Sequence, residues 1–302
     1  MHTSRPAPTG LVPILATPFD PDGQLDLASL RSLIEFQMRC GVDGLAVFGM
    51  ASEGFALTRA ERAAILREVR AVAGSELPLV AGVNATSTVT ALEMAEEAVE
   101  GGADHLMVLP PYLAKPSPEQ VCEFFTEVAA TAGVPVMVQD APGVTGVNIG
   151  VAQIVKLAAV PGIASVKVEA PPTPVKIAAI VAATATDFAV LGGQNAQDLI
   201  EEYDNGAVGT MPACEFSDHL RAVLDAFSAG RRAEARAAFD RLQPLIRLGV
   251  RPGQAWSVHK HVLVRRGIIA SERVRLPARP LDAVTQKALD EVLAGLTIDA
   301  DC

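Results

Sequence analysis

Short apolar segments alternate with longer amphipathic ones along most of the chain, and this alternation restricts the possible folds more than any other feature. Segments of about five residues that are apolar and end at turn residues are typical of buried β-strands. The segments between them carry apolar residues three and four positions apart, as Leu27, Leu30 and Leu33 do, which is the spacing of an amphipathic helix. Eight strands are predicted in this way, at residues 11–16, 44–48, 79–83, 105–109, 134–139, 163–168, 188–191 and 208–212.

Helix boundaries are also marked in the sequence. Thr58 with Glu61, and Thr90 with Glu93, have the spacing of a capping box, in which two side chains satisfy the free N–H groups of a helix start. Glycines stand where helices are expected to end, at positions 41, 74, 101, 102 and 133.

Eight β-then-α units over roughly 230 residues predict a (β/α)₈ barrel, the TIM barrel, whose usual length is about 250 residues. The alternative is an open doubly wound sheet, but no G-x-G-x-x-G follows the first predicted strand. After Gly230 the pattern becomes helical, with a break at residues 250–254. We therefore expect a barrel domain at residues 1–230 and a C-terminal helical extension at 231–302, packed on the barrel.

Composition limits the partners. Half of the 302 residues are apolar, yet no uninterrupted run of about 18 apolar residues predicts a transmembrane helix, and residues 1–10 lack the apolar core of a signal peptide. A formal charge of −10 without a basic cluster argues against binding to nucleic acid. The histidines and acids show no metal-ligand spacing, and the cysteines, at positions 40, 122, 214 and 302, are scattered. These features predict a cytoplasmic protein with no nucleic-acid, membrane or metal partner.

The segment I-A-S-V-K-V-E-A-P-P (163–172) places Lys167 inside an apolar strand, with Glu169 two positions later. Because burying an unpaired charge costs several kcal/mol, such a lysine is expected to be either paired or neutral. The first interpretation is a structural ion pair with Glu169 or with an acid of a neighbouring strand, and spacing alone favours it. The second is a lysine with a lowered pKa, whose neutral amine forms a Schiff base with a ketone.

A family resemblance changes that weighting. The chain resembles the dihydrodipicolinate synthase / N-acetylneuraminate lyase family of class I (Schiff-base) lyases from about residue 9 to 297. The residues that carry it are G-L-V-P-I-L-A-T-P-F (10–19), G-M-A-S-E (49–53), L-P-P-Y (109–112), V-Q-D-A-P (138–142) and V-K-V-E (166–169). The resemblance implies that Lys167 forms a covalent imine with a 2-keto acid, that no separate cofactor is needed, and that the protein is a homotetramer built as a dimer of dimers.

The chain departs from the family pattern in the turn after the second strand. The family usually has G-T-T-G-E or G-S-T-G-E there, whereas this chain has Gly49 to Glu53 as G-M-A-S-E. Ala51 therefore lacks the hydroxyl that normally helps to hold the substrate carboxylate. Backbone N–H groups of the turn are still able to bind an anion, and Ser52 is able to supply a displaced hydroxyl, so Ala51 and Ser52 are predicted substrate-binding residues.

A second departure lies at the end of the fifth strand, where the family has Y-N-x-P-x-R. Gln139 replaces the tyrosine, Asp140 the asparagine and Val144 the arginine, and Leu113 replaces the tyrosine that follows P-P-Y. A glutamine cannot ionise, so Gln139 is able to orient a carbonyl, hydroxyl or water but not to act as a general base. Dihydrodipicolinate synthesis and the tyrosine-dependent cleavage of sialic acid are therefore both disfavoured.

One branch of the family fits these departures better. V-Q-D-A-P (138–142), K-V-E-A-P (167–171) and G-I-I-A-S-E-R (267–273) resemble the 2-keto-3-deoxy-L-arabonate dehydratases, which form 2-oxoglutarate semialdehyde and water. On this interpretation Lys167 forms the iminium, a C3 proton leaves and the C4 hydroxyl departs. Candidates for moving protons are Glu169, Asp140, Ser52, a water held by Gln139, and Lys167 itself. Glu169 is alternatively a structural ion-pair partner, and Asp140 alternatively fixes a loop.

The remaining site predictions concern the last two strands and the extension. Gly193 and Gln194 follow the seventh strand, where a ligand could approach the backbone, and Met211 is expected to line the pocket wall. His259 and His261 are interpreted as surface or interface residues. Three functions stay open: a hydro-lyase acting on a 2-keto-3-deoxy sugar acid, a pyruvate-releasing aldolase of the same family, and a keto-acid-binding protein without turnover.

Overall fold

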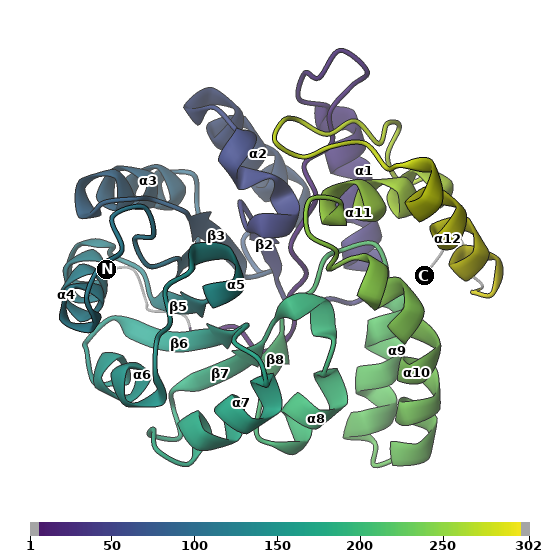
Figure 1. Ribbon diagram of the computed structural model, residues 1–302. Helices are drawn as coiled ribbons and strands as arrows, with labels where there is room; N and C mark the ends of the chain where they lie inside the picture. Colours follow the sequence, from purple (N-terminus) through teal and green to yellow (C-terminus); the bar gives the residue numbers. More distant parts are fainter. Residues whose placement is uncertain (1–5, 297–302) are drawn as a thin grey trace.

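The sheet closes into a barrel in the computed structural model, which describes residues 6–296 (Figure 1). Its eight strands are all parallel and neighbour one another in the order β1-β8-β7-β6-β5-β4-β3-β2. A parallel bridge from Ile14, which follows β1, to Ala46 of β2 joins the two ends of that order. The strands are β1 (Gly10–Leu11), β2 (Leu45–Val47), β3 (Leu79–Val83), β4 (His105–Val108), β5 (Val136–Asp140), β6 (Ile163–Val168), β7 (Ala189–Gly192) and β8 (Gly209–Thr210).

This arrangement confirms the predicted (β/α)₈ barrel and excludes the open doubly wound sheet. Each predicted strand is present, and β3 and β6 have the predicted bounds. The helices are α1 (Leu27–Arg39), α2 (Arg59–Ala73), α3 (Thr88–Glu100), α4 (Pro118–Thr131), α5 (Pro142–Thr145), α6 (Val151–Ala158), α7 (Thr173–Val181), α8 (Leu199–Asp204), α9 (Ser217–Ser228), α10 (Arg232–Leu248), α11 (Ala255–Arg265) and α12 (Ala283–Ala294), with short 3₁₀ turns η1 (Met50–Ser52), η2 (Gly54–Ala56) and η3 (Gln194–Ala196).

One of the two predicted helix starts is correct. Thr58 and Glu61 form the reciprocal capping box of α2. Thr90 does not begin α3, because Ser87 is the N-cap and its hydroxyl accepts the N–H of Thr90. Ser87 and Thr90 are both hydroxyl residues with acids downstream, and the sequence pattern does not distinguish a cap from a residue one turn later.

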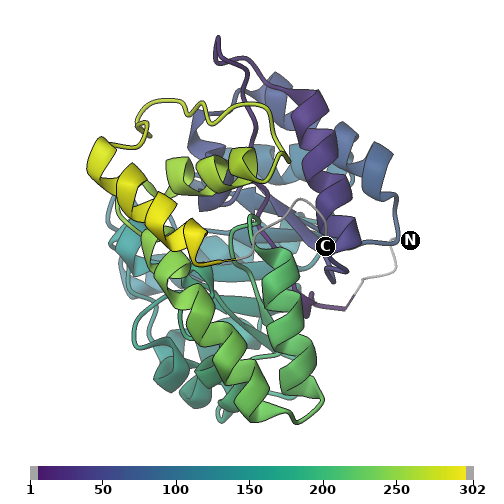
Figure 2. The same cartoon turned by 90° about the vertical axis from the view of Figure 1, so that its right-hand side faces the viewer.

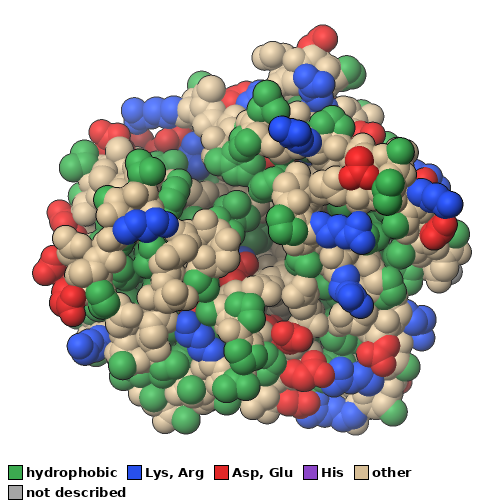
Figure 3. All heavy atoms as spheres, viewed as in Figure 1, with side chains coloured by type: hydrophobic (Ala, Val, Ile, Leu, Met, Phe, Trp, Pro, Cys, Tyr) green, Lys and Arg blue, Asp and Glu red, His purple; other side chains and the backbone are tan. Residues whose placement is uncertain are grey.

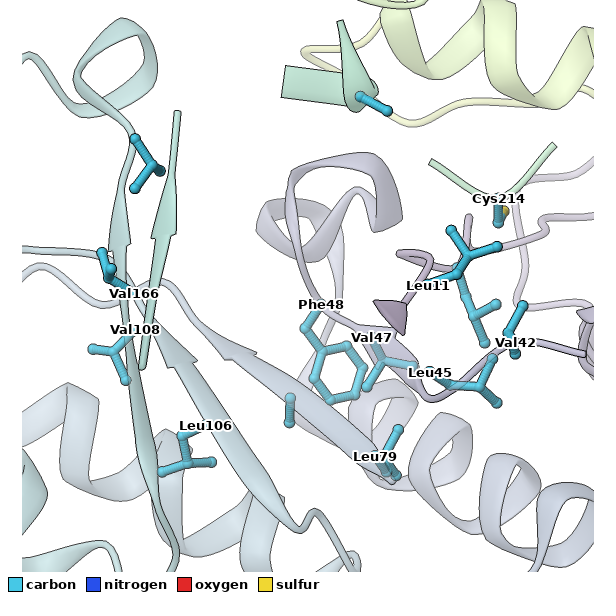
Figure 4. Close-up of a cluster of buried hydrophobic side chains, with 14 of the residues drawn as sticks. Leu11, Val42, Leu45, Val47, Phe48, Leu79, Leu106, Val108, Val166 and Cys214 are labelled. Atoms are coloured by element: carbon cyan, nitrogen blue, oxygen red, sulfur yellow. The ribbon is translucent and has the colours of Figure 1, made fainter. Parts of the chain in front are cut away.

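Strand side chains alternate between two cores. Inside the barrel lies a small apolar cluster formed by Val12, Ile14, Ala46, Val80, Met107, Met137, Ala189, Leu191 and Met211. Alternate residues of the same strands point outward and pack under the helices in a much larger cluster (Figure 4), which includes Leu45, Leu79, Leu106 and Val166. This period of two is the geometry of a strand, and it decides which side chains reach the interior.

The chain after β8 is helical. Helices α9 and α10 lie side by side, α12 packs against α10, and α11 contacts η1 (Figures 1 and 2). The predicted break at 250–254 is present between α10 and α11. The domain boundary at residue 230 stays a prediction, and residues 297–302 of the predicted extension lie outside the described residues. Among the described residues, none of the helices combines the length and the apolarity that a membrane span requires.

The turn after β2 folds back tightly against β3, and this contact requires a glycine. A Cβ added at Gly82 lies 2.4 Å from the carbonyl oxygen of Phe48, which is backbone and cannot rotate away. We expect Gly82→Ala to lower the free energy of unfolding by about 1–3 kcal/mol, as other overpacking substitutions do. Gly143→Ala is the control, since a Cβ there meets no atom within 4 Å. Denaturation midpoints of both variants test this, and equal midpoints contradict it.

Candidate active site

The site is built at the carboxyl ends of the strands, around β6. Viewed from this side, the surface is hollowed at its centre (Figure 3). Val166 and Val168 belong to the outer core, so Lys167, which alternates with them, points into the barrel. In the sheet register Lys167 stands opposite Gln139 of β5 and Leu191 of β7. Its side chain is 2% exposed.

A carboxylate links the two predicted catalytic side chains. Lys167 Nζ lies 3.2 Å from Oε1 of Glu169, and Gln139 Nε2 donates a hydrogen bond of 2.7 Å to Oε2 of the same carboxylate. The ion pair that the sequence spacing suggested is therefore present. It does not exclude the Schiff-base interpretation, because a carboxylate at hydrogen-bonding distance is also able to take the ammonium proton. The structure thus brings Lys167, Glu169 and Gln139 together.

The loop after β7 holds Glu169 in place. The backbone N–H and the side-chain amide of Gln194 donate to the Oε1 and the backbone oxygen of Glu169, respectively. A Cβ added at Gly193 lies 2.3 Å from Glu169 Cγ and 3.0 Å from Lys167 Cε, so only glycine allows this approach. Gln194, Asn195 and Ala196 have φ between 48° and 61°, a left-handed conformation that non-glycine residues rarely adopt. Strain of this kind is concentrated at functional sites.

The turn after β2 forms another wall. Ala51 packs against the cluster inside the barrel, which also contains the buried Met211. Ser52 is buried, and its Oγ has no hydrogen-bond partner within residues 6–296; the same is true of Gln139 Oε1. Because buried polar atoms are nearly always satisfied, these two oxygens are natural partners for a bound ligand. The hydroxyl of Ser52 is a donor and an acceptor, whereas the amide oxygen of Gln139 only accepts.

Asp140 does not join this group, which corrects the prediction that it binds substrate. It alternates with Gln139 along β5 and so faces the helices, where its Oδ2 lies 2.6 Å from Nζ of Lys176 in α7. Burial raises the pKa of Asp140, and the hydrogen bond from Lys176 opposes that rise. Asp140 is therefore an ion-pair partner of Lys176 on the outer side of the sheet.

Sequence reasoning missed a second buried lysine. Lys260 of α11 is fully buried, and its Nζ lies 2.5 Å from Oε1 of Glu53, the last residue of the G-M-A-S-E turn. Burial lowers the pKa of Lys260 to about 8, and Glu53 opposes the shift. Glu53 itself has a φ of 52°.

The surface interpretation of His259 and His261 is wrong, because both are buried. Nδ1 of His259 lies 2.7 Å from the buried Glu215, and Nδ1 of His261 lies 2.7 Å from Glu272. Glu215 precedes α9 and Glu272 follows α11, so neither partner is indicated by the spacing within residues 255–265.

Behind the Gly192–Gly193 corner lies a buried acid that the sequence reading also missed. Glu202 of α8 accepts a hydrogen bond of 2.6 Å from Thr173, and a Cβ added at Gly192 would overlap its Oε2. The pKa of Glu202 is raised from 4.5 to about 7, chiefly by burial; the hydrogen bond from Thr173 opposes the rise, and the negative charges of Asp198 and Glu169 add to it.

A parallel barrel whose mouth encloses a lysine beside a carboxylate has the architecture of the lysine-dependent lyases. The chain belongs to the dihydrodipicolinate synthetase family, whose model matches residues 7–296. It is therefore a lyase of a family that works through a Schiff-base lysine.

Individual relatives cover nearly the whole chain. A 4-hydroxy-tetrahydrodipicolinate synthase of Streptomyces coelicolor is 34% identical over 95% of this chain and 93% of its own length. An L-2-keto-3-deoxyarabonate dehydratase of Azospirillum brasilense is 31% identical over 95% of this chain and 94% of its own. Among solved structures, the dihydrodipicolinate synthase of Acinetobacter baumannii complexed with pyruvate has a TM-score of 0.88 at 26% identity, covering 97% of this chain and all of that one.

The raised pKa of Glu202 predicts a pH-dependent stability. Between pH 4.5 and about 7 the folded protein binds more protons at Glu202 than the unfolded chain, so the contribution of this residue is fully present below pH 4.5 and is lost as the pH rises through 7. Glu202→Gln removes the ionisation. We expect the variant to gain stability over the natural protein by up to about 3 kcal/mol between pH 5 and pH 8. Urea denaturation at both pH values measures this, with Glu234→Gln on the exposed face of α10 as the control, and a pH-independent difference contradicts it.

Proposed function

We propose that the protein is a Schiff-base hydro-lyase that acts through Lys167 on a 2-keto-3-deoxy sugar acid such as 2-keto-3-deoxy-L-arabonate. The observation that carries this proposal is the single carboxylate, Glu169, in contact with both Lys167 and Gln139. It supplies an ionisable group beside the imine-forming nitrogen at a site where the family's tyrosine is replaced by an amide. The similarity to the Azospirillum brasilense dehydratase supports the same branch.

The first step is formation of the imine. Glu169 Oε1 accepts a proton from the Lys167 ammonium, and the neutral amine attacks the C2 carbonyl of the keto acid. Glu169 returns that proton to the C2 hydroxyl of the carbinolamine, which leaves as water, so that the iminium forms and Glu169 is a carboxylate again. The surroundings of Lys167 favour this step because they exclude bulk water, which would otherwise compete for the intermediate.

Elimination follows from the electron demand of the iminium. The C3–H bond is acidified, Glu169 removes that proton, and the bonding electrons form the enamine. The enamine then expels the C4 hydroxyl, which departs as water with a proton returned from the carboxylic acid. The resulting iminium has its double bond at C3–C4; it loses a proton from C5 and gains one at C3 to give the C4–C5 enol, which gains a proton at C4 and loses its hydroxyl proton to become the aldehyde. Hydrolysis of the iminium by one water then releases the semialdehyde and the free lysine. The water lost on imine formation is regained here, so one water is released in total.

The carboxylate of the substrate is assigned to the turn after β2. Ala51 packs against the cluster inside the barrel, and the unpartnered Ser52 Oγ is able to donate a hydrogen bond to a carboxylate oxygen. Gln139 Oε1 accepts a hydrogen bond from a substrate hydroxyl or from water. Gly193 keeps the wall by Lys167 open, Gln194 fixes Glu169, and Met211 shapes the floor.

Aldol cleavage with release of pyruvate is the second candidate. Relatives named 4-hydroxy-tetrahydrodipicolinate synthase are 31% and 34% identical to this chain, similar to the 31% of the dehydratase. Both reactions use the same Schiff base and differ in whether a C–O or a C–C bond breaks.

The proposal further includes a homotetramer, a dimer of dimers, with the barrel at 1–230 and the extension at 231–302 in each subunit.

The imine is tested by borohydride reduction. We expect treatment with pyruvate, and separately with 2-keto-3-deoxy-L-arabonate, to leave a stable adduct on the peptide that contains Lys167, found by mass spectrometry. Lys167→Arg should give no adduct while keeping a positive charge beside Glu169. Lys176→Arg is the control, since Lys176 pairs with Asp140 on the outer side of the sheet. An adduct on another lysine, or none, would remove the proposal, and detection of pyruvate as product would select the aldolase.

Glu169→Gln separates proton transfer from binding. The amide retains the size and hydrogen-bonding capacity of the side chain but cannot take the C3 proton. We expect kcat to fall by about 100-fold or more, the usual contribution of general acid–base catalysis, while the borohydride adduct still forms slowly. The control is Glu272→Gln, which alters an exposed acid paired with His261. A kcat within about threefold of the natural enzyme would show that Glu169 is only an ion-pair partner.

A further inference from the structure

The turn that follows β2 is held from the C-terminal extension at both of its ends. At its start, Trp256 Nε1 of α11 donates a hydrogen bond of 2.5 Å to the backbone oxygen of Met50. At its end, Lys260, one helical turn further along α11, forms the buried ion pair with Glu53. Ala51 and Ser52 lie between these two points, more than 200 residues away in sequence from the helix that fixes them.

The attachment at Glu53 involves both carboxylate oxygens. Oε1 meets Lys260, and Oε2 accepts the backbone N–H of Arg275 at 2.9 Å. Lys260 is fixed in turn, because its Nζ donates to the backbone oxygen of Arg273 at 2.7 Å and lies 4.2 Å from the centre of the Phe19 ring. A buried ion pair of this kind has little freedom, so Glu53 is tied to one position relative to α11.

The attachment at Met50 is a single hydrogen bond, but its geometry is also specific. The Trp256 ring meets Phe55 edge to face at 5.1 Å, which orients the indole toward the turn. The backbone oxygen of Met50 also accepts the N–H of Glu53 inside the turn. Loss of the indole N–H therefore removes an outside constraint from the turn without leaving its carbonyl unpaired.

We propose that Trp256 and Lys260 are positioning residues that set the location of the Ala51–Ser52 backbone for the carboxylate of the keto acid. This inference rests on the proposed function, which assigns the carboxylate to that turn. It gives the extension a role in substrate binding although its residues touch neither Lys167 nor Glu169 among the contacts described above. Displacements of about 1 Å at a binding group are enough to reduce affinity and rate strongly.

Trp256→Phe is the sharpest test, because it keeps an aromatic ring beside Phe55 and deletes only the N–H donor. Borohydride trapping on Lys167 is measured with two carbonyl compounds, pyruvate and propanal; propanal forms an imine but has no carboxylate. We expect the pyruvate concentration for half-maximal trapping to rise about three- to tenfold, the value of one hydrogen bond. Trapping with propanal should be unchanged, and with substrate KM should rise while kcat stays within about twofold.

A second variant tests the other attachment. Lys260→Met alone leaves Glu53 buried without its cation, which is strongly destabilising, so it is combined with Glu53→Gln. The pair is expected to show the same selective loss with pyruvate. Arg265→Gln is the matched control on α11, since Arg265 is exposed and pairs with Asp290 rather than with the turn.

The outcomes separate this inference from the proposed function. If the natural protein forms no adduct at Lys167 with either compound, the Schiff-base proposal fails first. If the natural protein forms the adduct, two results with Trp256→Phe overturn the positioning role: equal weakening of trapping with pyruvate and with propanal, or no weakening with either. Selective loss with pyruvate at an unchanged thermal midpoint supports it, because a general structural defect would affect both compounds alike.

Discussion

The contact between the Lys167 ammonium and the Glu169 carboxylate is the constraint around which the barrel mouth is arranged. A cation inside an apolar barrel needs a partner, and the nearest possible one on the same strand face is two residues away. The strand register then places Gln139 opposite Lys167, where its amide meets the second carboxylate oxygen. The third neighbour, Gly193, has no side chain, because a Cβ there would displace Glu169. The need to satisfy one buried charge thus accounts for the position of Glu169, for Gln139 opposite Lys167 and for the glycine at position 193.

The parts of the fold that depend on local patterns were predictable from the sequence. The strand 163–168 has its predicted bounds, because an apolar run between turn residues is compatible with little else. The capping box at Thr58 was correct, whereas the one at Thr90 lies a turn too late. The position of Asp140 could also have been predicted, because alternation along β5 places Gln139 inside the barrel and its neighbour Asp140 outside it. That prediction was wrong because a family position was followed in place of the strand period.

Contacts between the extension and the barrel could not be predicted from the sequence, because they are set by tertiary packing. Nothing near Lys260 in the sequence indicates that its partner is Glu53. The histidines beside it were interpreted as surface or interface residues for the same reason. Glu202 is a similar case, since its burial depends on the Gly192–Gly193 corner and on Thr173 from different segments. Local spacing identifies residues that share a face, whereas charge pairs across the fold need coordinates.

The position of Glu169 also bears on which bond the proposed reaction breaks. In aldol cleavage a base removes the proton of the C4 hydroxyl, whereas in dehydration an acid protonates the departing hydroxyl. A tyrosine relay connected to solvent suits the first case, and Gln139 cannot take part in such a relay. A carboxylate that has just taken the C3 proton is in its acid form, one carbon away from the leaving group. Lys167 is then part of the imine, and the hydrogen bonds to the Glu169 carboxylate within residues 6–296 come from Gln139 and Gln194, so that proton is most simply returned to the C4 oxygen. One carboxyl group acting twice on the same face therefore favours loss of water over cleavage of the carbon chain.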